Sequence, residues 1–337
     1  MNRQAKTILA AALISVGLVV GPVPSFAQEA GEPAAVTARP ITSFRLNSGE
    51  TRFGKLDFIG GLVLGADNPL FGALSSIRFL PDHEHFMIVM DTGHWLRGRI
   101  TRDGEGRLKS IEDVVITSMI DRMGRTEADK FDMDSEGLAF RDGDALVSFE
   151  RRHRVDVYPG PDFETARPRR TIGTLIPPAY LKTNGSFETI AVAPKDGSLQ
   201  GAAVVVTERS VDKDGNLYAA ILDGPLKGRF AVRHHDSFDV SDGVFLPDGD
   251  LVLLQRRFTM ALGIGLRIIR IKGADIRPGA VVDGEILMEA DMGEKIDNME
   301  GIDAVPAPDG STHLILVSDD NHSILQRSLM LEFKLVE

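Results

Sequence analysis

The sequence of 337 residues contains no cysteine. Disulfides, thiolate catalysis and cysteine-ligated zinc are therefore excluded, and so is a lipid anchor on an N-terminal cysteine. Packing and hydrogen bonds must hold this chain together without covalent cross-links.

Several catalytic motifs are absent as well. The sequence has no Gly-x-Ser-x-Gly element, which disfavours a serine hydrolase of the usual type. It has neither a P-loop nor a dinucleotide fingerprint, so no nucleotide or organic cofactor is expected. After the first 27 residues it shows almost no amphipathic helical periodicity and no apolar run that could cross a bilayer, so stable membrane insertion is not expected.

Positive charge is in the minority. The chain has 38 Lys and Arg against 49 Asp and Glu, which gives a formal net charge of -11. Such a surface repels phosphate backbones, so nucleic acid is not an expected partner. The acidity is compatible with cation binding, but it also suits an ordinary solvated surface.

The first 27 residues have the pattern of a cleavable export signal. A positively charged start precedes an apolar run over residues 7–20, and Ser25 and Ala27 supply the small residues of a cleavage site. A membrane anchor is the alternative, but the run is shorter than the roughly 20 residues that a span needs. We therefore predict a periplasmic or secreted protein with a flexible leader over residues 28–40 and one domain over residues 41–337.

The remaining chain repeats itself. Each copy has a short apolar strand, a turn of the Pro-Asp-Gly type, a second apolar strand and then polar residues. Four copies span residues 134–152, 186–209, 241–257 and 298–320, and a degenerate copy spans residues 74–92. The aligned positions are Ser75, Glu136, Glu188, Asp242 and Glu300. Their spacing of roughly 50 to 60 residues is the size of a four-stranded propeller blade.

This period predicts an all-β fold, a β-propeller of about six four-stranded blades. Five blades correspond to the visible copies. A sixth is expected from strands at residues 41–46 and 55–64 together with a C-terminal strand at residues 329–336, which would close the ring and remove exposed strand edges. A β-sandwich is the alternative, but a regular long repeat argues against it.

The repeat places acidic residues at one end of the ring. In an antiparallel hairpin the start of one strand lies beside the end of its neighbour, so each aligned acid should lie near the polar residues that end the next strand. The expected neighbours are Glu136 with Glu150 and Arg151, Glu188 with Glu208 and Arg209, Asp242 with Gln255 and Arg256, and Glu300 with Asp319 and Asp320. Together they should crowd one mouth of the central channel.

Two interpretations of this mouth remain open. One is structural: Glu–Arg pairs satisfy one another and lock the blades together. The other is a binding site, in which carboxylates hold a hard cation such as Ca²⁺ and arginines bind an anion. The predicted metal ligands are Glu136, Asp242, Glu300 and Asp319. The predicted anion-binding residues are Arg151, Arg209 and Arg256, and the predicted catalytic residues are Glu136, Glu188, Glu300 and His235. The blade of Glu300 is the expected cation position, because its second strand ends in Asp319-Asp320-Asn321 and lacks the arginine.

Other candidates are weaker. His83-Glu84-His85 has metal-like spacing but falls in a predicted turn, and Asp212-Lys213-Asp214 begins like a calcium loop but lacks the terminal Glu. His94 and Trp95 follow Asp91 and are placed near the same mouth. His235 precedes the third copy and is a candidate general base.

Several segments also resemble a known family. Asp-Ser-Glu-Gly-Leu-Ala at 134–139, Ser-Phe-Glu-Arg at 148–151, residues 184–191, Asn-Met-Glu-Gly-Ile at 298–302 and the tail 317–333 are similar to the phytase-like family, described by its esterase-like activity of phytase. The resemblance runs from about residue 44 to the C-terminus. It implies a propeller, export and hydrolysis of an ester or phosphoester. Calcium-dependent propeller phytases use a cluster of Ca²⁺ ions and a metal-activated water, but their Asp-Asp-Pro-Ala run is not present here.

Two functions are therefore expected to compete. The first is a metal-assisted hydrolase acting on a phosphorylated or other anionic ester, with Ca²⁺ as the expected metal. The second is a non-catalytic propeller that binds a ligand or a partner protein at the same mouth. The sequence indicates neither the substrate nor the oligomeric state.

Overall fold

A computed structural model of the protein describes residues 31–126, 129–235 and 237–336. The predicted signal at residues 1–27 and the cleavage before Gln28 lie outside these residues. Within them, no helix is long and apolar enough to cross a membrane.

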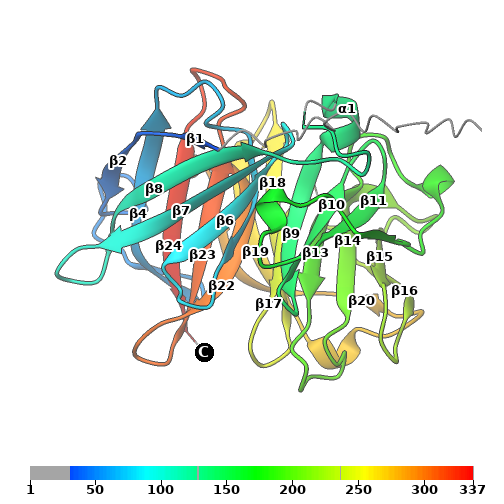
Figure 1. Ribbon diagram of the computed structural model, residues 1–337. Helices are drawn as coiled ribbons and strands as arrows, with labels where there is room; N and C mark the ends of the chain where they lie inside the picture. Colours follow the sequence, from blue (N-terminus) through cyan, green and yellow to red (C-terminus); the bar gives the residue numbers. More distant parts are fainter. Residues whose placement is uncertain (1–30, 127–128, 236, 337) are drawn as a thin grey trace, which may run out of the picture.

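Strands form almost all of the regular structure, arranged in five sheets (Figure 1). Blade one contains β1 (Glu32–Pro33), β5 (Leu74–Phe79), β6 (His85–Met90), β7 (His94–Arg102) and β8 (Leu108–Ser118). Blade two contains β9 (Ser135–Arg141), β10 (Asp144–Phe149), β11 (Arg154–Tyr158) and β12 (Arg170–Ile172). Blade three contains β13 (Phe187–Val192), β14 (Ala203–Val211), β15 (Leu217–Ile221), β16 (Gly228–Val232) and β20 (Val281–Val282). Blade four contains β17 (Asp239–Phe245), β18 (Leu251–Thr259), β19 (Gly263–Ile271) and β21 (Glu285–Ala290). Blade five contains β2 (Val36–Ile41), β3 (Arg52–Phe53), β4 (Leu56–Ala66), β22 (Asn298–Pro306), β23 (Thr312–Asp319) and β24 (Ser328–Leu335).

Short helical segments lie between the strands. They are α1 (Lys130–Met133) and three 3₁₀ turns at Phe163–Thr165, Pro178–Tyr180 and Gly273–Asp275. The Asp129 side chain caps α1 by accepting a hydrogen bond from the backbone N–H of Phe131. This turn holds the chain beside the start of β9.

The repeated hairpins follow from local chemistry. In blade two, Asp142 and Gly143 connect β9 to β10 with φ angles of 54° and 88°. Positive φ at both central residues is the signature of a type I′ turn, whose twist matches that of the two strands, and Asp-Gly is a favoured sequence for it. The apolar strands on either side then pair as the repeat predicts.

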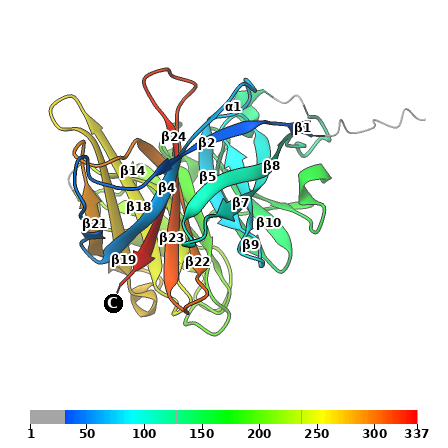
Figure 2. The same ribbon diagram turned by 90° about the vertical axis from the view of Figure 1, so that its left-hand side faces the viewer.

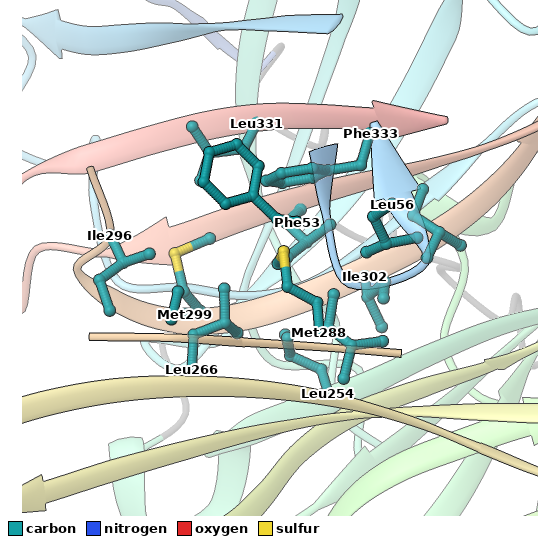
Figure 3. Packing of buried hydrophobic residues seen from close by; sticks show 14 of the residues in the cluster. Phe53, Leu56, Leu254, Leu266, Met288, Ile296, Met299, Ile302, Leu331 and Phe333 are labelled. Atoms are coloured by element: carbon teal, nitrogen blue, oxygen red, sulfur yellow. The ribbon is translucent and has the colours of Figure 1, made fainter. Parts of the chain in front are cut away.

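Five apolar clusters join the five blades into a ring. Each cluster combines side chains from two neighbouring blades, and together they cover all five interfaces. Figure 3 shows the interface of blades four and five, where Leu254 and Leu266 pack against Met299 and Leu331. The inner strands β5, β9, β13, β17 and β22 also contact one another in a closed cycle. The all-β propeller is therefore confirmed.

The expected number of blades was wrong: there are five, not about six. The chain ends do share a blade, because β4 pairs with β24 from Ser328↔Leu64 to Leu335↔Leu56 (Figure 2). However, these strands complete the blade of β22 and β23, the Glu300 copy, rather than building an additional one. Each of the five sheets is open.

The predicted leader over residues 28–40 also needs correction. Part of this stretch is strand, because β1 pairs with β8 and β2 pairs with β4. Ala34, between them, is buried. Residues 32–41 therefore belong to the propeller and span two of its blades.

Candidate functional site

A β-bulge interrupts every inner strand at the same level of the ring. The extra residue is Ser75 in β5, Glu188 in β13, Ser241 in β17 and Glu300 in β22, and in β9 it falls within Glu136–Gly137. A bulge bends the strand and re-aims the side chain that it carries. In three blades the re-aimed side chain is a glutamate that faces the end of the channel.

These glutamates open onto a cavity of about 730 Å³, which we term the mouth cavity. Charged side chains dominate its lining, with nine carboxylates and five cations. The carboxylates are Asp91, Asp134, Glu136, Glu150, Glu188, Glu208, Asp239, Glu300 and Asp319, and the cations are Lys130, Arg151, Arg209, Arg256 and Arg257. The repeat therefore converges on one mouth, as predicted.

Arg256 links three blades across this cavity. Its guanidinium lies 3.1 Å from Glu208 of blade three and 3.1 Å from Glu300 of blade five, and donates a 2.8 Å hydrogen bond to Asn298. Asn298 in turn donates to Glu300 at 2.7 Å. This arrangement matches the structural interpretation, in which Glu–Arg pairs lock the blades.

Three other cations also have carboxylate partners. Those pairs are Arg151 with Asp134 at 2.5 Å, Arg209 with Glu208 at 2.9 Å and Lys130 with Asp91 at 2.8 Å. Four of the five cavity cations are thus neutralised by carboxylates of the same cavity.

Glu136 and Glu188 are the exceptions to this pairing. In the described part of the chain, neither carboxylate accepts a hydrogen bond or pairs with a cation, although Glu188 is only 6% exposed. Burial raises the pKa of Glu188 well above its ordinary value, and the carboxylates of Glu136 and Glu208 raise it further. The pKa of Glu136 rises in the same way, through burial and then through Glu150 and Asp134. The carboxyl groups of Glu136 and Glu188 are therefore held close to other carboxyl groups, without a hydrogen-bonded partner among the described residues.

Glu150 joins these residues into two carboxylate triads. Asp134, Glu136 and Glu150 each offer an oxygen within 4.8 Å of the others, and so do Glu150, Glu188 and Glu208. Glu150 is fixed from behind, because the backbone N–H groups of Gly185 and Ser186 each donate to it at 2.6 Å. Burial raises the pKa of Glu150, while these hydrogen bonds oppose the rise. The first triad belongs to blade two, and the second joins blade two to blade three through Glu150.

The blade of Glu300, where the sequence predicted the cation, does not hold a carboxylate triad among the described residues. Burial raises the pKa of Glu300 to about 8 in spite of Arg256, and raises that of Asp319 to about 6. Asp319 accepts a 2.8 Å hydrogen bond from the backbone N–H of Asn321. Both residues line the cavity, but neither belongs to a carboxylate triad. The densest set of oxygen ligands lies on the other side of the mouth.

Asp242 does not reach the mouth, which corrects the sequence interpretation. The bulge of β17 falls on Ser241, so Asp242 is one residue out of step with the other aligned acids and faces away from the cavity. It is fully buried and pairs with Arg78 at 3.0 Å, while Ser76 donates to it at 2.8 Å. We call this Arg78–Asp242 pair the plug.

The candidate histidines and Trp95 also lie outside the mouth. His235 is half exposed and pairs with Asp283 at 2.9 Å, and it does not line the cavity. Trp95 is completely buried and packs on Tyr158. His85 begins β6 and pairs with Asp82 of the exposed turn before it at 2.6 Å, in keeping with the preferred interpretation of that segment as a solvated turn.

Sequence reasoning did not assign ligand roles to Asp134, Glu150 and Glu208. A usable signal exists for two of them, because an acid directly follows the second strand in both Phe149-Glu150 and Thr207-Glu208. Asp134 precedes β9 and carries no repeated signature. The second triad depends on a contact between blades two and three, which the repeat alone does not reveal.

Known proteins provide two further findings. The family model for phytase-like proteins, described as esterase-like activity of phytase, matches residues 69–322. No curated protein matches the chain in sequence.

Solved structures resemble the chain only distantly. An endo-arabinase from Bacteroides thetaiotaomicron is 12% identical over 88% of this chain and 98% of its own, with a TM-score of 0.47. A glucose dehydrogenase is 12% identical over 82% of this chain and 98% of its own, with a TM-score of 0.41. Similarities at this level do not bear on substrate or reaction.

Proposed function

Since the chain belongs to the phytase-like family, we propose that it is a metal-assisted hydrolase of a phosphorylated or other anionic ester, acting in the mouth cavity. The observation that carries this proposal is Glu188, a buried carboxylate with no cationic partner inside a carboxylate triad. An isolated buried charge is costly, and proteins normally pair it or use it to coordinate a metal.

The triads fit a hard divalent cation. Ca²⁺ takes six to eight oxygen ligands at about 2.3–2.6 Å, so two oxygens on one ion lie at most about 5 Å apart. The oxygens of each triad lie within 4.8 Å of one another, and all are carboxylates. The residues that would hold the metal are Asp134, Glu136, Glu150, Glu188 and Glu208. A cation bound there lowers the pKa of a coordinated water and polarises an ester oxygen.

Two cavity carboxylates outside the triads are suited to proton transfer. A general base or acid works best when its pKa lies near the operating pH. Asp319, whose pKa is raised by burial to about 6, is the candidate group to accept a proton from an attacking water. Glu300, whose pKa is raised by burial to about 8, is the candidate donor of a proton to a leaving-group oxygen. Environments that push two carboxyl pKa values apart often define an acid and a base.

The arginines of the rim have a secondary role in this proposal. Arg151, Arg209 and Arg256 already contact carboxylates, which holds their guanidinium groups in fixed positions. Arg151 and Arg209 remain more than one-third exposed, so their outward N–H groups are accessible to an anion. Fixed donors lose little entropy when an anionic ester binds.

The test is a hydrolysis screen of the purified protein against phosphomonoesters, phosphodiesters and carboxylesters, each with Ca²⁺ and with a chelator. We expect hydrolysis of at least one class with Ca²⁺ only. Glu188→Gln should reduce it by about 100-fold, since it removes a ligand charge and leaves the shape. The matched control Glu84→Gln, in the exposed turn between β5 and β6, should retain full activity. No Ca²⁺-dependent hydrolysis in any class would reject the proposal.

A non-catalytic propeller is the second candidate, and the Arg256 bridge favours it. Arg256 ties three blades together across the mouth and needs no substrate to do so. Ca²⁺ binding without hydrolysis of any ester would support this alternative, in which the cavity binds a ligand or a partner protein.

Export is part of the same proposal. It rests on the charged, apolar and small-residue pattern of residues 1–27. N-terminal sequencing of protein recovered outside the cytoplasm should begin at or near Gln28. An intact Met1 on membrane-bound protein would contradict it.

A further inference from the structure

Arg257, on β18, differs from the other cations of the mouth cavity. Lys130, Arg151, Arg209 and Arg256 each have a carboxylate partner, whereas Arg257 has none among the described residues. Its Nε is buried without a hydrogen-bond partner. A partly buried guanidinium with unused donors is a site for an anion, because Arg binds carboxylate and phosphate oxygens with two parallel N–H groups.

The structure holds this guanidinium in place without neutralising it. Its Cζ atom lies 4.7 Å from the centre of the Phe238 ring, a cation–π contact. The residue opposite Arg257 on β19 is Gly265, and a Cβ there would lie 2.9 Å from Nη2 and 3.1 Å from Cζ. Glycine is therefore required for the guanidinium to lie against that strand.

An apolar wall adjoins the same site. Phe258, Ile264 and Leu325 line the mouth cavity, and Phe258 and Leu325 are 75% and 88% exposed. Phe258 and Ile264 face each other at the paired ends of β18 and β19, and Leu325 lies in the loop between β23 and β24. The β18–β19 turn and this loop rise on the same side of the ring in both views (Figures 1 and 2). Exposed apolar side chains gathered at the rim of a polar cavity indicate contact with an apolar group.

We propose that Arg257 binds the anionic group of the substrate and that the apolar wall of Phe258, Ile264 and Leu325 binds a hydrocarbon part next to it. The ligand is thus an amphiphilic anionic ester, such as an alkyl phosphate. This inference rests on the proposed function for its reaction, but the binding step does not require hydrolysis.

Calorimetry with two probes tests it: inorganic phosphate, and decyl phosphate below its micelle concentration, both in the presence of Ca²⁺. We expect decyl phosphate to bind at least about tenfold more tightly, since burial of several CH₂ groups is favourable. Arg257→Gln should weaken both probes by about tenfold or more, the usual loss for a charge-assisted hydrogen bond. Leu325→Ser should weaken decyl phosphate and leave inorganic phosphate unchanged. Gly265→Ala should reproduce the Arg257→Gln effect by displacing the guanidinium.

Arg229→Gln is the matched control, because Arg229 is exposed on the outer strand β16 far from the mouth cavity lining. It should bind both probes as the wild type does. Vesicles of phosphatidylcholine with and without phosphatidic acid then distinguish a membrane-borne ligand from a free amphiphile. Melting curves of each variant exclude loss of fold.

Equal binding of the two probes, or unchanged binding by Arg257→Gln, would overturn the inference, as would no binding to the wild type. If Arg257 has no effect while Ca²⁺-dependent hydrolysis depends on Glu188, the inference fails and the proposed function stands. If Arg257-dependent binding persists without any Ca²⁺-dependent hydrolysis, the proposed function fails and the binding site stands.

Discussion

The plug and the mouth cavity are two regions of the same ring with opposite electrostatics. In the plug, Asp242 receives hydrogen bonds from Arg78, Ser76 and the backbone N–H of Ile302, so it has a cation and further donors as partners. In the mouth, Glu136 and Glu188 have no such partners. Both sets of acids come from the bulged segments of inner strands, yet a shift of one residue sends them to different environments.

This difference in pairing suggests a structural role for the plug and a binding role for the mouth cavity. Arg78 also donates to the carbonyls of Ile302 and Gly243, both at 2.7 Å, so the plug ties blade one to blades five and four. Its polar groups are satisfied by the protein. In the mouth cavity, by contrast, Glu136 and Glu188 lack hydrogen-bonded partners among the described residues, which disfavours the folded state unless a ligand supplies one.

The largest effect should come from breaking the plug. Arg78→Met leaves Asp242 buried without its cation, which should lower the free energy of unfolding by about 3–5 kcal/mol. Asp242→Asn should also destabilise strongly, by removing the carboxylate that pairs directly with Arg78. Urea denaturation of both variants measures the loss. A decrease below about 1 kcal/mol would show that the plug is not needed for stability.

The second effect is a pH dependence of the stability of the metal-free protein. Burial raises the pKa of Glu300 to about 8 in the folded state, from an ordinary value of 4.5. The folded state therefore binds the proton more tightly, and the stability that this proton contributes is lost as pH rises from about 4.5 to about 8. We expect the melting temperature in chelator to fall by several degrees across this window.

Glu300→Gln isolates the contribution of the Glu300 proton to stability, because the glutamine amide does not titrate in this pH range. The difference in melting temperature between wild type and variant should shrink or reverse as pH rises through the window. Groups with a lowered pKa, such as Asp309, are already ionised below this pH window. They therefore do not mask the loss of stability between about pH 4.5 and pH 8. A difference that does not change with pH would contradict the raised pKa.

A third prediction compares the two regions directly. In chelator at neutral pH, Glu188→Gln should raise the free energy of unfolding by about 1 kcal/mol, because it removes a like charge from the triads. The equivalent amide change at the plug, Asp242→Asn, should lower it. Both are measured by the same urea titration. Destabilisation by Glu188→Gln would mean that Glu188 has a structural partner.

The smallest effect should come from the rim. Arg209→Gln removes one partner of Glu208, but Arg256 remains 3.1 Å from the same carboxylate. Because Arg209 is 39% exposed, we expect a loss of no more than about 0.5 kcal/mol. A loss above about 2 kcal/mol would favour the view that the whole mouth is a structural lock.

The sequence predicted those parts of the molecule that depend on the repeat. The five hairpins follow from apolar strands and turns at a regular spacing, and the convergence of Glu136, Glu188 and Glu300 follows from aligning them. The pairing of the chain ends, β4 with β24, was expected, but the sixth blade was wrong because β24 also pairs with β23 and so adds these strands to the blade of Glu300.

The errors at the site have a similar cause. Asp242 aligns with Glu300 in sequence, but the bulge on Ser241 turns its side chain to the other face, and a bulge position cannot be read from an apolar alternation. The Arg256 bridge joins residues of three blades, so no single copy contains it. His235 pairs with Asp283 because β20, which precedes Asp283, lies parallel to β16. This strand pairing is not part of the repeat.

The most direct test of this account is a Ca²⁺ titration of the melting temperature for the wild type and for Glu188→Gln. Ligand at about 100 times its dissociation constant adds about 2.7 kcal/mol, or about 4 °C for a domain of this size. We predict this rise for the wild type and its loss in Glu188→Gln, with Glu84→Gln behaving as the wild type. No rise in the wild type, or an equal rise in Glu188→Gln, would contradict a cation site built on the unpaired carboxylates of the mouth.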